Sequence, residues 1–347
     1  MSFGLQKKQL PNFWLPMRKQ LFDNHGRVLN YVRLAVTDRC NLRCFYCMPE
    51  EGIQYINKTE LMSYEEITRA MTLLSQMGIK KVRITGGEPF IRKDMMKLLT
   101  AIRSIDGIRT INITTNGTVL EPYILELKKL GIRSVNLSLD TLDRDRFYKI
   151  TRRDVFDKVM HSFDLLLTHG FDVKINAVVM AGQNEEDIIP LADLARTHPV
   201  GVRFIEEMPF NGAGAHYETL QWNHKKILQK IRDQFPHLQK LPDPPSSTSM
   251  NYKDPAHKGT IGIIAAYSRT FCGTCNRIRI TPKGMLKTCL YDNGVFNIKT
   301  IMREGATDEQ LRATFLDAFR HRAKDGFEAE QGRFGNSVSE SMATIGG

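Results

Sequence analysis

Three cysteines near the start of the chain are spaced so that their thiolates can bind an iron–sulfur cluster. Cys40, Cys44 and Cys47 form a C-x3-C-x2-C run, and three thiolates at this spacing can hold three corners of a [4Fe-4S] cluster. The fourth iron then lacks a protein ligand. An open iron can bind a small molecule and pass it an electron, whereas a structural site normally closes its coordination with a fourth residue. The run therefore indicates chemistry rather than scaffolding.

The other three cysteines form a second set, in which Cys272-x2-Cys275 is followed after thirteen residues by Cys289. Two odd triplets in a chain of 347 residues fit reduced thiolates that hold metal better than disulfides. A second three-thiolate cluster would also have an open iron, which a substrate atom could occupy. The alternative is a zinc-stabilised module that binds nucleic acid, but neither set has a fourth Cys or a His at ligand spacing.

With the aromatic Tyr46 inside it, the first run resembles the signature of the radical S-adenosylmethionine (radical SAM) enzymes. This resemblance implies that the open iron chelates the amino and carboxylate groups of the methionyl moiety. It also implies that the electron of the cluster cleaves the sulfonium, and that a 5'-deoxyadenosyl radical then abstracts hydrogen from the substrate. The spacing by itself implies only an incomplete cluster.

The residues around the second set narrow the resemblance to one family. The stretch from Phe271 to Arg279 (FCGTCNRIR), followed by Gly284 and Cys289-Leu290, is similar to the C-terminal region of the GTP 3',8-cyclases, the molybdenum cofactor biosynthesis protein A family. Further matches are GGEP at 86–89, TTNG at 114–117, NLSLD at 136–140, RFIE at 203–206 and the final Gly346-Gly347. The order of these motifs and the two Cys spacings together make the match specific from about residue 31 to the end.

The family resemblance implies roles for particular residues. It implies two [4Fe-4S] clusters, one on each Cys triplet. It places S-adenosylmethionine beside the first cluster, against Tyr46, Gly87, Thr114, Ser138, Arg203 and Met208. It places GTP against Arg33, Arg83, Lys174, Arg277 and Arg279, with the purine at the second open iron, and it brings Gly346 and Gly347 into the active site. Each of these residues taken singly also fits ordinary packing at strand ends, a solvent-facing strand or a frayed terminus.

The implied reaction converts GTP to (8S)-3',8-cyclo-7,8-dihydroguanosine 5'-triphosphate, the first step toward molybdopterin. The implied partners are GTP, an electron donor such as flavodoxin or ferredoxin, the downstream cyclic pyranopterin monophosphate synthase and a second copy of the chain in a homodimer. The rival enzyme hypothesis is a peptide-modifying relative with an auxiliary cluster. A third Cys set is missing for that role, and the pair Arg277-x-Arg279 favours a small phosphorylated substrate, because both side chains leave one face of a strand and present planar forks of donors.

Apolar strand-like segments alternate with helical patterns between residues 31 and about 206, which predicts βα units around a parallel sheet. The expected strands are Tyr31 to Thr37, Lys80 to Thr85, Thr110 to Thr115, Ser134 to Leu139, Asp172 to Met180 and Val200 to Glu206; helices are expected at about 64–77, 94–105, 120–130, 154–169 and 185–198. The polar motifs follow the carboxyl ends of these strands, the edge that bears the active site of βα barrels. Six units predict an incomplete (βα)6 TIM-type barrel with a lateral opening.

The predicted organisation has three parts: a basic N-terminal extension at 1–30, the partial barrel core at 31–210 and a C-terminal region at 211–347. After Glu206 the pattern changes to a Gly-containing loop, a helix near 222–234 and a Pro/Ser-rich segment at 241–249 that is typical of a linker or mobile loop. Strands at Ile261 to Ala265 and Arg277 to Thr281 frame the second Cys set. We expect this region to cover the opening of the barrel and to bring the two clusters face to face across one cavity.

The net charge of +11 suits a polyanionic partner, for which a triphosphate is the economical choice. The basic residues are dispersed and aromatic residues make up only 9% of the chain, so the composition does not favour nucleic acid. No apolar run is long enough to span a membrane, and the first residues lack the apolar core of a signal peptide. A cytoplasmic location is expected, with the mitochondrial matrix as the alternative if the basic extension is a transit peptide.

Overall fold

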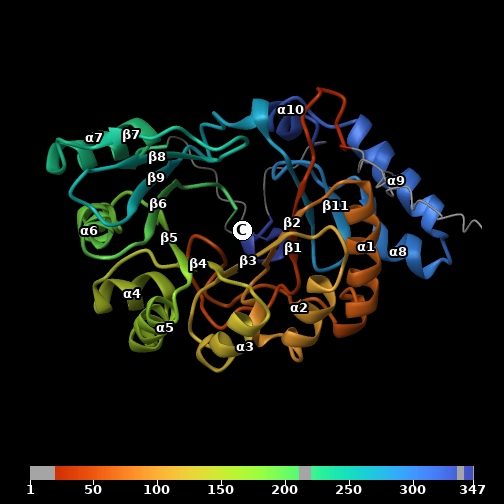
Figure 1. Ribbon diagram of the computed structural model, residues 1–347, viewed down its shortest axis with the longest axis horizontal. Helices are drawn as coiled ribbons and strands as arrows, with labels where there is room; N and C mark the ends of the chain where they lie inside the picture. Colours follow the sequence, from red (N-terminus) through yellow and green to blue (C-terminus); the bar gives the residue numbers. More distant parts are fainter. Residues whose placement is uncertain (1–19, 211–219, 334–339, 347) are drawn as a thin grey trace, which may run out of the picture.

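The computed structural model describes residues 20–210, 220–333 and 340–346, and these form one curved sheet with helices along its outer face (Figure 1). The sheet has twelve strands in the order β12-β11-β10-β1-β2-β3-β4-β5-β6-β9-β8-β7. Its central part is parallel, and each strand in it is covered by apolar contacts on the helix side. The expected α/β class is therefore confirmed.

The six predicted strands all form and pair in chain order. They are β1 (Tyr31–Ala35), β2 (Lys81–Thr85), β3 (Thr110–Thr115), β4 (Ser134–Ser138), β5 (Asp172–Val179) and β6 (Gly201–Glu206). β5 and β6 alternate buried and half-buried residues, because one face packs on the helices and the other faces an internal cavity. Polar residues on the second face therefore point away from the helices.

The helices of the βα units lie outside the sheet (Figure 1). They are α1 (Tyr64–Met77), α2 (Met95–Arg103), α3 (Ile124–Lys129), α4 (Arg144–Thr151), α5 (Phe156–Thr168) and α6 (Ile188–Thr197). α1 begins where the sequence indicates, since Ser63 and Glu66 form a reciprocal capping box. α4 was not predicted. Short 3-10 turns lie at Lys58–Glu60, Pro89–Ile91, Glu121–Tyr123, Glu185–Asp187 and Cys272–Thr274.

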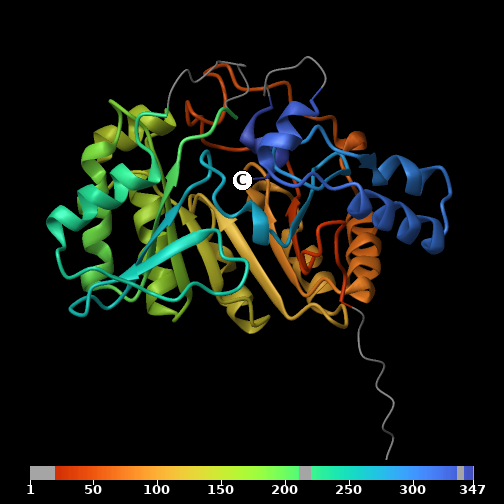
Figure 2. The same ribbon diagram turned by 90° about the horizontal axis from the view of Figure 1, so that it is seen from above.

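The C-terminal region extends the sheet at both edges (Figure 2). β9 (Thr260–Ile264) pairs parallel with β6, and β10 (Arg277–Ile280) pairs parallel with β1, so eight consecutive strands in the sheet order are parallel. The flanking antiparallel strands are β7 (Gln239–Lys240), β8 (Ser249–Lys253), β11 (Met285–Lys287) and β12 (Phe296–Asn297). The remaining helices are α7 (His224–Gln234), α8 (Ile298–Arg303), α9 (Asp308–Arg320), α10 (Gly326–Gln331) and α11 (Met342–Ile345).

The segment at 20–30 differs from the basic extension expected over residues 1–30. Leu21 and Leu29 are buried, and Asp23 forms a buried ion pair with Arg27. The guanidinium of Arg27 donates to the backbone carbonyls of Cys272, Ala323 and Lys324. This segment is therefore part of the folded C-terminal region, and the predicted extension shortens to residues 1–19, which lie outside the described residues.

The main apolar core fills the space between the sheet and its outer helices. A second, smaller cluster contains Phe210, Tyr291, Ala329 and Ile345, and Cys289 packs against it. It joins the end of β6, the second Cys set and the C-terminal segment. No helix among the described residues is long and apolar enough to cross a membrane.

Candidate active site

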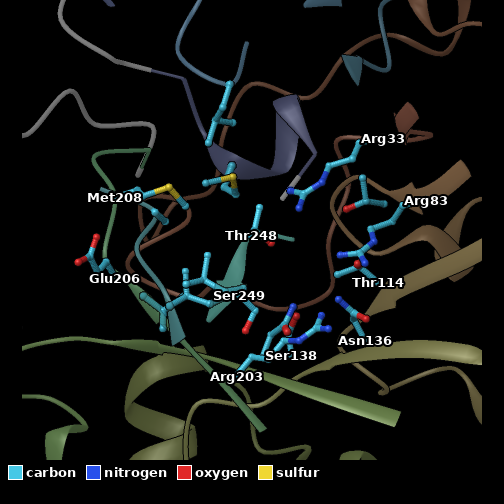
Figure 3. Close-up of a pocket in the computed structure, with 18 of the residues that line it drawn as sticks. Arg33, Arg83, Thr114, Asn136, Ser138, Arg203, Glu206, Met208, Thr248 and Ser249 are labelled. Atoms are coloured by element: carbon cyan, nitrogen blue, oxygen red, sulfur yellow. The ribbon is translucent and has the colours of Figure 1, made fainter. Parts of the chain in front are cut away.

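One internal cavity of about 480 Å³ is lined by both cysteine triplets (Figure 3). Its walls include Cys40, Cys44 and Cys47 from the N-terminal part of the chain and Cys272, Cys275 and Cys289 from the C-terminal part. Other predicted site residues also line it: Arg33, Tyr46, Arg83, Gly87, Thr114, Ser138, Arg203, Met208, Arg277 and Arg279. The cavity is within the usual size range of small-molecule sites. The fold thus brings together residues separated by more than two hundred positions.

Gly86 and Gly87 hold the backbone that leads into the first triplet. Modelling a Cβ on Gly86 would place it 2.3 Å from the carbonyl oxygen of Thr37, and a Cβ on Gly87 would lie 2.1 Å from that of Arg39. The N–H of Gly87 donates to Thr37 and that of Glu88 to Arg39, each at 2.8 Å. The family resemblance placed S-adenosylmethionine against Gly87. The structure adds that both glycines are required for contact with the chain's own Cys loop.

Glu88 connects this glycine turn to the third strand. Its fully buried carboxylate accepts hydrogen bonds from the hydroxyl of Thr115 at 2.9 Å and from the N–H of Asn116 at 2.8 Å. Burial raises the pKa of Glu88 to about 7 despite these donors. Asn116 in turn donates to the Sγ of Cys40 at 3.7 Å. The motifs at 86–89 and 114–117 therefore act together to position Cys40.

Tyr46 and Asp140 anchor the middle of the first Cys loop. The Tyr46 hydroxyl donates to Oδ2 of Asp140 at 2.8 Å, and the N–H of Val178 donates to Oδ1 at the same distance. Burial raises the pKa of Asp140 to about 6 and raises the pKa of Tyr46 above its ordinary value. Asp140 was quoted in a sequence motif but not predicted as a site residue; its place directly after β4 was the available signal.

Arg322 positions the second triplet and was not predicted from the sequence. Its side chain is buried, and Nη2 donates to the Sγ of Cys275 at 3.1 Å. It also donates to the carbonyls of Cys275, Arg277 and Thr288, at 2.9 Å each, and forms an ion pair with Asp23 at 3.1 Å. Burial opposes ionisation of Cys275, but Arg277 and Arg322 together lower the pKa of its thiol to about 6.

The basic side chains form layers across neighbouring strands of the sheet. Arg33 on β1 is in register with Arg279 on β10 and with Arg83 on β2. Two residues earlier on β1, Tyr31 is in register with Arg277 and Lys81. Arg203 lies on β6 beside Asn176 of β5. Because residues at equal register share a face, these cations converge on the cavity. Figure 3 shows Arg33, Arg83 and Arg203 around it.

This cationic wall has the properties of an anion site. Burial lowers the pKa of Arg33 to about 10 and that of Arg279 to about 9, and repulsion among the neighbouring arginines adds to the decrease. Several buried polar atoms also lack hydrogen-bond partners among the described residues: Nε of Arg33 and Arg83, the hydroxyls of Tyr31, Thr114 and Ser249, and side-chain atoms of Asn136 and Asn176. Unpaired buried polar groups are costly, so a polar, anionic ligand fits this wall.

Two predicted site residues lie away from the cavity wall. Lys174 does not line it and instead forms an ion pair with Asp172 on the same strand. Gly346 accepts a hydrogen bond at its carbonyl from Arg279, and a Cβ added there would lie 2.8 Å from the side chain of Thr85. The C-terminal tail thus contacts the basic wall at Arg279. Gly347 lies outside the described residues.

The segment before Gly346 joins the two Cys sets. The Ser341 hydroxyl donates to the carbonyl of Cys47 at 2.6 Å, and the N–H of Met342 donates to the carbonyl of Phe210 at 3.0 Å. Met342 and Ala343 line the cavity, while Ile345 belongs to the apolar cluster against which Cys289 packs. The C-terminal segment is therefore a wall of the site rather than a frayed end.

Glu206 was assigned only as a strand end, yet it fixes two distant segments. Its buried carboxylate accepts hydrogen bonds from the N–H and Nδ1 of His224, at 2.7 and 2.8 Å, and from the N–H and hydroxyl of Ser268, at 2.7 and 2.8 Å. No sequence pattern links these positions. Residues 244–249 of the Pro/Ser-rich segment also line the cavity, which the sequence predicted only as a linker or mobile loop.

The thiol sets fit clusters better than a single ion. Zinc gathers its ligands at about 2.3 Å from one atom, whereas each thiolate of a cubane cluster binds a different iron. In residues 20–210, 220–333 and 340–346, no three Cys, His, Asp or Glu side chains are gathered as one ion requires. Each triplet instead presents three thiols around a shared cavity. Three thiols around one cavity are a donor set that suits an iron–sulfur cluster.

Comparison with known proteins gives the family. The radical SAM superfamily model matches residues 34–195, and the Molybdenum Cofactor Synthesis C model matches residues 200–327. The Arabidopsis thaliana protein named "GTP 3',8-cyclase, mitochondrial" is 37% identical over 339 residues, which cover 96% of this chain and 85% of the relative. The chain belongs to the GTP 3',8-cyclase family of the radical SAM superfamily.

Several other relatives are longer than the present chain. Molybdenum cofactor biosynthesis protein 1 of Drosophila melanogaster is 41% identical over 304 residues, covering 88% of this chain and 54% of the relative. The chain thus spans about half the length of several relatives that it matches. Among solved structures, Streptococcus suis SuiB bound to precursor peptide SuiA has a TM-score of 0.61 at 16% identity, covering 90% of this chain and 70% of that one. This likeness concerns the fold.

Proposed function

We propose that this chain is a radical SAM GTP 3',8-cyclase, which converts GTP to (8S)-3',8-cyclo-7,8-dihydroguanosine 5'-triphosphate in the first step of molybdenum cofactor biosynthesis. The observation that best supports this is one cavity lined by two thiol triplets and a layered arginine wall. A radical enzyme needs the first triplet, and a triphosphate substrate needs the cations. The family names of the relatives support the same reaction.

The proposed cofactors are two [4Fe-4S] clusters and S-adenosylmethionine. Cys40, Cys44 and Cys47 would hold the first cluster, and Cys272, Cys275 and Cys289 the second. When bound, the first cluster and S-adenosylmethionine would supply the electron and the carbon radical that removes hydrogen from ribose C3'. C3' would then bond to purine C8, and one further electron from the electron donor, with a proton, would complete the 7,8-dihydro product. S-adenosylmethionine would lie against Tyr46, Gly87, Thr114, Ser138, Arg203 and Met208, which all line the cavity.

The residues of the chain bind and orient the nucleotide. Arg33, Arg83, Arg277 and Arg279 would hold its phosphates through charge-assisted hydrogen bonds, which are short and strong in a buried wall. Lys174 lies on the same face of β5 as Asn176, and it would contribute its charge to the wall while paired with Asp172. The carbonyl of Gly346 already orients Arg279. Gly346 and Gly347 would thus act on turnover through the position of this arginine.

The wider setting is also a proposal. The eight parallel strands would form an incomplete barrel core, over residues 31–210 with β9 and β10 added, and residues 211–347 would close its opening. Flavodoxin or ferredoxin would supply electrons, and cyclic pyranopterin monophosphate synthase would take the product. The chain would act as a homodimer in the cytoplasm. The alternative location is the mitochondrial matrix, which the name of the plant relative suggests.

The test is anaerobic reconstitution with iron and sulfide, followed by incubation with S-adenosylmethionine, dithionite and GTP. Both 5'-deoxyadenosine and the cyclised nucleotide are measured. Near-stoichiometric formation of both, dependent on GTP, is expected. Formation of 5'-deoxyadenosine without a product from GTP would retain the radical machinery and reject this substrate. Failure to assemble any cluster would reject the proposal and favour the zinc module.

A further inference from the structure

Tyr31, the first residue of β1, lies at the centre of the cationic wall. Its neighbours in register are Arg277 on β10 and Lys81 on β2. The ammonium of Lys81 is 4.8 Å from the centre of the Tyr31 ring, and the guanidinium carbon of Arg83 is 5.8 Å from it. An aromatic face stabilises cations at such distances. The ring therefore supports two cations from different layers of the wall.

The hydroxyl of Tyr31 makes no hydrogen bond of ordinary geometry among the described residues, although the guanidiniums of Arg33 and Arg83 lie near it, and the side chain is 7% exposed. Buried tyrosine hydroxyls normally find a partner. The charged side chains that act most strongly on this phenol among the described residues are cations: Arg33 on β1, Lys81 and Arg83 on β2, and Arg277 on β10. Arg203 on β6 also interacts with it. The acceptor that such a hydroxyl lacks is an anionic oxygen.

We propose that Tyr31 is a positioning residue for the phosphate chain of the substrate. Its ring holds Lys81 and Arg83 against mutual repulsion, and its hydroxyl links their layer to a phosphate oxygen when the nucleotide is bound. This inference rests on the proposed function, because it takes GTP as the ligand of this wall. It predicts that Tyr31 matters for phosphates and leaves recognition of the nucleoside unchanged.

The charge state of Tyr31 adds a second signature. Burial alone would raise its pKa, but Arg83, Arg33, Lys81 and Arg277 lower it to about 8. The protonated phenol can donate to a phosphate, whereas a phenolate competes with the phosphate for the same cations. An anionic ligand offsets these cations and raises the pKa of the phenol. GTP binding should therefore take up protons and weaken as the pH rises through 8.

The experiment measures the affinity of the reconstituted holoenzyme for GTP, GDP and guanosine under anaerobic conditions. Tyr31→Phe keeps the ring and removes the hydroxyl, and we expect about tenfold weaker binding of GTP and GDP at pH 7. Tyr31→Leu removes both, with an expected loss of about 10- to 100-fold. Guanosine affinity should stay unchanged in both variants. Tyr148→Phe, at an exposed position on α4, is the control.

The pH series separates this role from general packing. Between pH 7 and 9 the ratio of GTP affinities, wild type to Tyr31→Phe, should fall toward one, since titration of the other groups is common to both proteins. Equal GTP affinity in all variants, or an equal loss for guanosine, would overturn the inference while leaving the cyclase function intact. Failure of the wild type to bind GTP would overturn both.

Discussion

Backbone contacts and buried carboxylates position the loop with Cys40, Cys44 and Cys47, whereas buried arginines position Cys272, Cys275 and Cys289. In the first loop, Gly87 allows two chain segments to touch, and Arg43 donates to the carbonyl of Cys40. The charges of Glu88 and Asp140 add to burial in raising the pKa of Cys40 and of Cys44. In the second, Arg27 and Arg322 donate to the backbone around the cysteines, and Arg322 donates to a sulfur. The two sites therefore depend on different interactions and should fail in different ways.

The charged groups around the thiols also differ between the two Cys sets. Burial raises the pKa of Cys40 to about 12 and that of Cys47 to about 11, so the free thiols of the first set stay protonated. In the second set, burial also raises the pKa of Cys272 and raises that of Cys289 to about 11, but around Cys275 two arginines reverse the effect of burial. The arginines near Cys275 suit an anionic substrate at the second site. S-adenosylmethionine carries a positive sulfonium, and no arginine is among the main influences on the thiols of the first site, where it would otherwise repel this charge.

The largest effect is expected from Gly87→Ala. The new methyl would overlap the carbonyl of Arg39, so the first Cys loop must move. Because a displacement of about 1 Å can cost about 100-fold in rate, we expect at least that loss in 5'-deoxyadenosine formation. Iron content after reconstitution should fall toward that of one cluster.

Gly273→Ala is the matched control within the second Cys loop. A Cβ at Gly273 has no neighbour within 4 Å, and its φ is outside the left-handed region. This variant should keep its iron and its activity. Equal damage from both substitutions would contradict the idea that only the first loop depends on a glycine contact.

Arg322→Gln should damage the second site and leave the first intact. It removes one partner of the buried Asp23 and the donor to Cys275. Loss of one member of a buried ionic network costs about 3 kcal/mol, which urea unfolding can measure. The electron paramagnetic resonance signal of the second cluster should change as well.

The control for this prediction is Arg196→Gln, which removes an exposed ion pair with Asp193. Such pairs contribute about 0–1 kcal/mol. If the two variants unfold at the same urea concentration, the buried network around Asp23 does not stabilise the second site.

Arg277→Ala tests the basic wall beside the second site. One charge-assisted hydrogen bond is worth about 1.5–3 kcal/mol, so GTP should bind about 10- to 100-fold more weakly. Arg320→Ala, at an exposed position on α9, should bind GTP as the wild type does. Unchanged affinity in the Arg277 variant would remove this residue from the nucleotide site.

The smallest effect is expected on the pH dependence of the free energy of unfolding, through Glu88 beside the first Cys loop. Glu88 has a pKa of about 7 in the folded chain against 4.5 in the unfolded chain, so the folded form binds a proton more tightly. The free energy of unfolding of the cluster-free chain should therefore decrease as the pH rises from about 4.5 to 7. Glu88→Gln should flatten this slope by up to about 1.4 kcal/mol per pH unit. An identical slope in both proteins would show that Glu88 does not titrate there.

The sequence was sufficient to predict the six central strands, and most of the predicted site residues line the cavity, because their motifs follow the carboxyl ends of strands that lie side by side in a parallel sheet. Long-range pairing was beyond its reach. β9 and β10 are close in the chain yet join opposite ends of the six-stranded core, and the change of pattern after Glu206 did not reveal this.

Buried polar contacts were the other part that could not be predicted. Arg322 and Cys275 are separated by 47 positions, and nothing in either local pattern indicates their contact. Lys174 is a different case: Asp172 precedes it by two positions on a strand, so the two share a face and their pairing was foreseeable. Local periodicity thus predicts which face a side chain takes, but partners distant in the chain emerge only from the fold.

The central claim is that the first triplet generates the radical and the second holds the substrate across one cavity. The most direct test replaces Cys272, Cys275 and Cys289 together with alanine and measures 5'-deoxyadenosine and cyclised nucleotide from the reconstituted protein. The account predicts that 5'-deoxyadenosine still forms while cyclisation of GTP is lost. Undiminished cyclisation, or loss of 5'-deoxyadenosine with the first cluster still assembled, would contradict it.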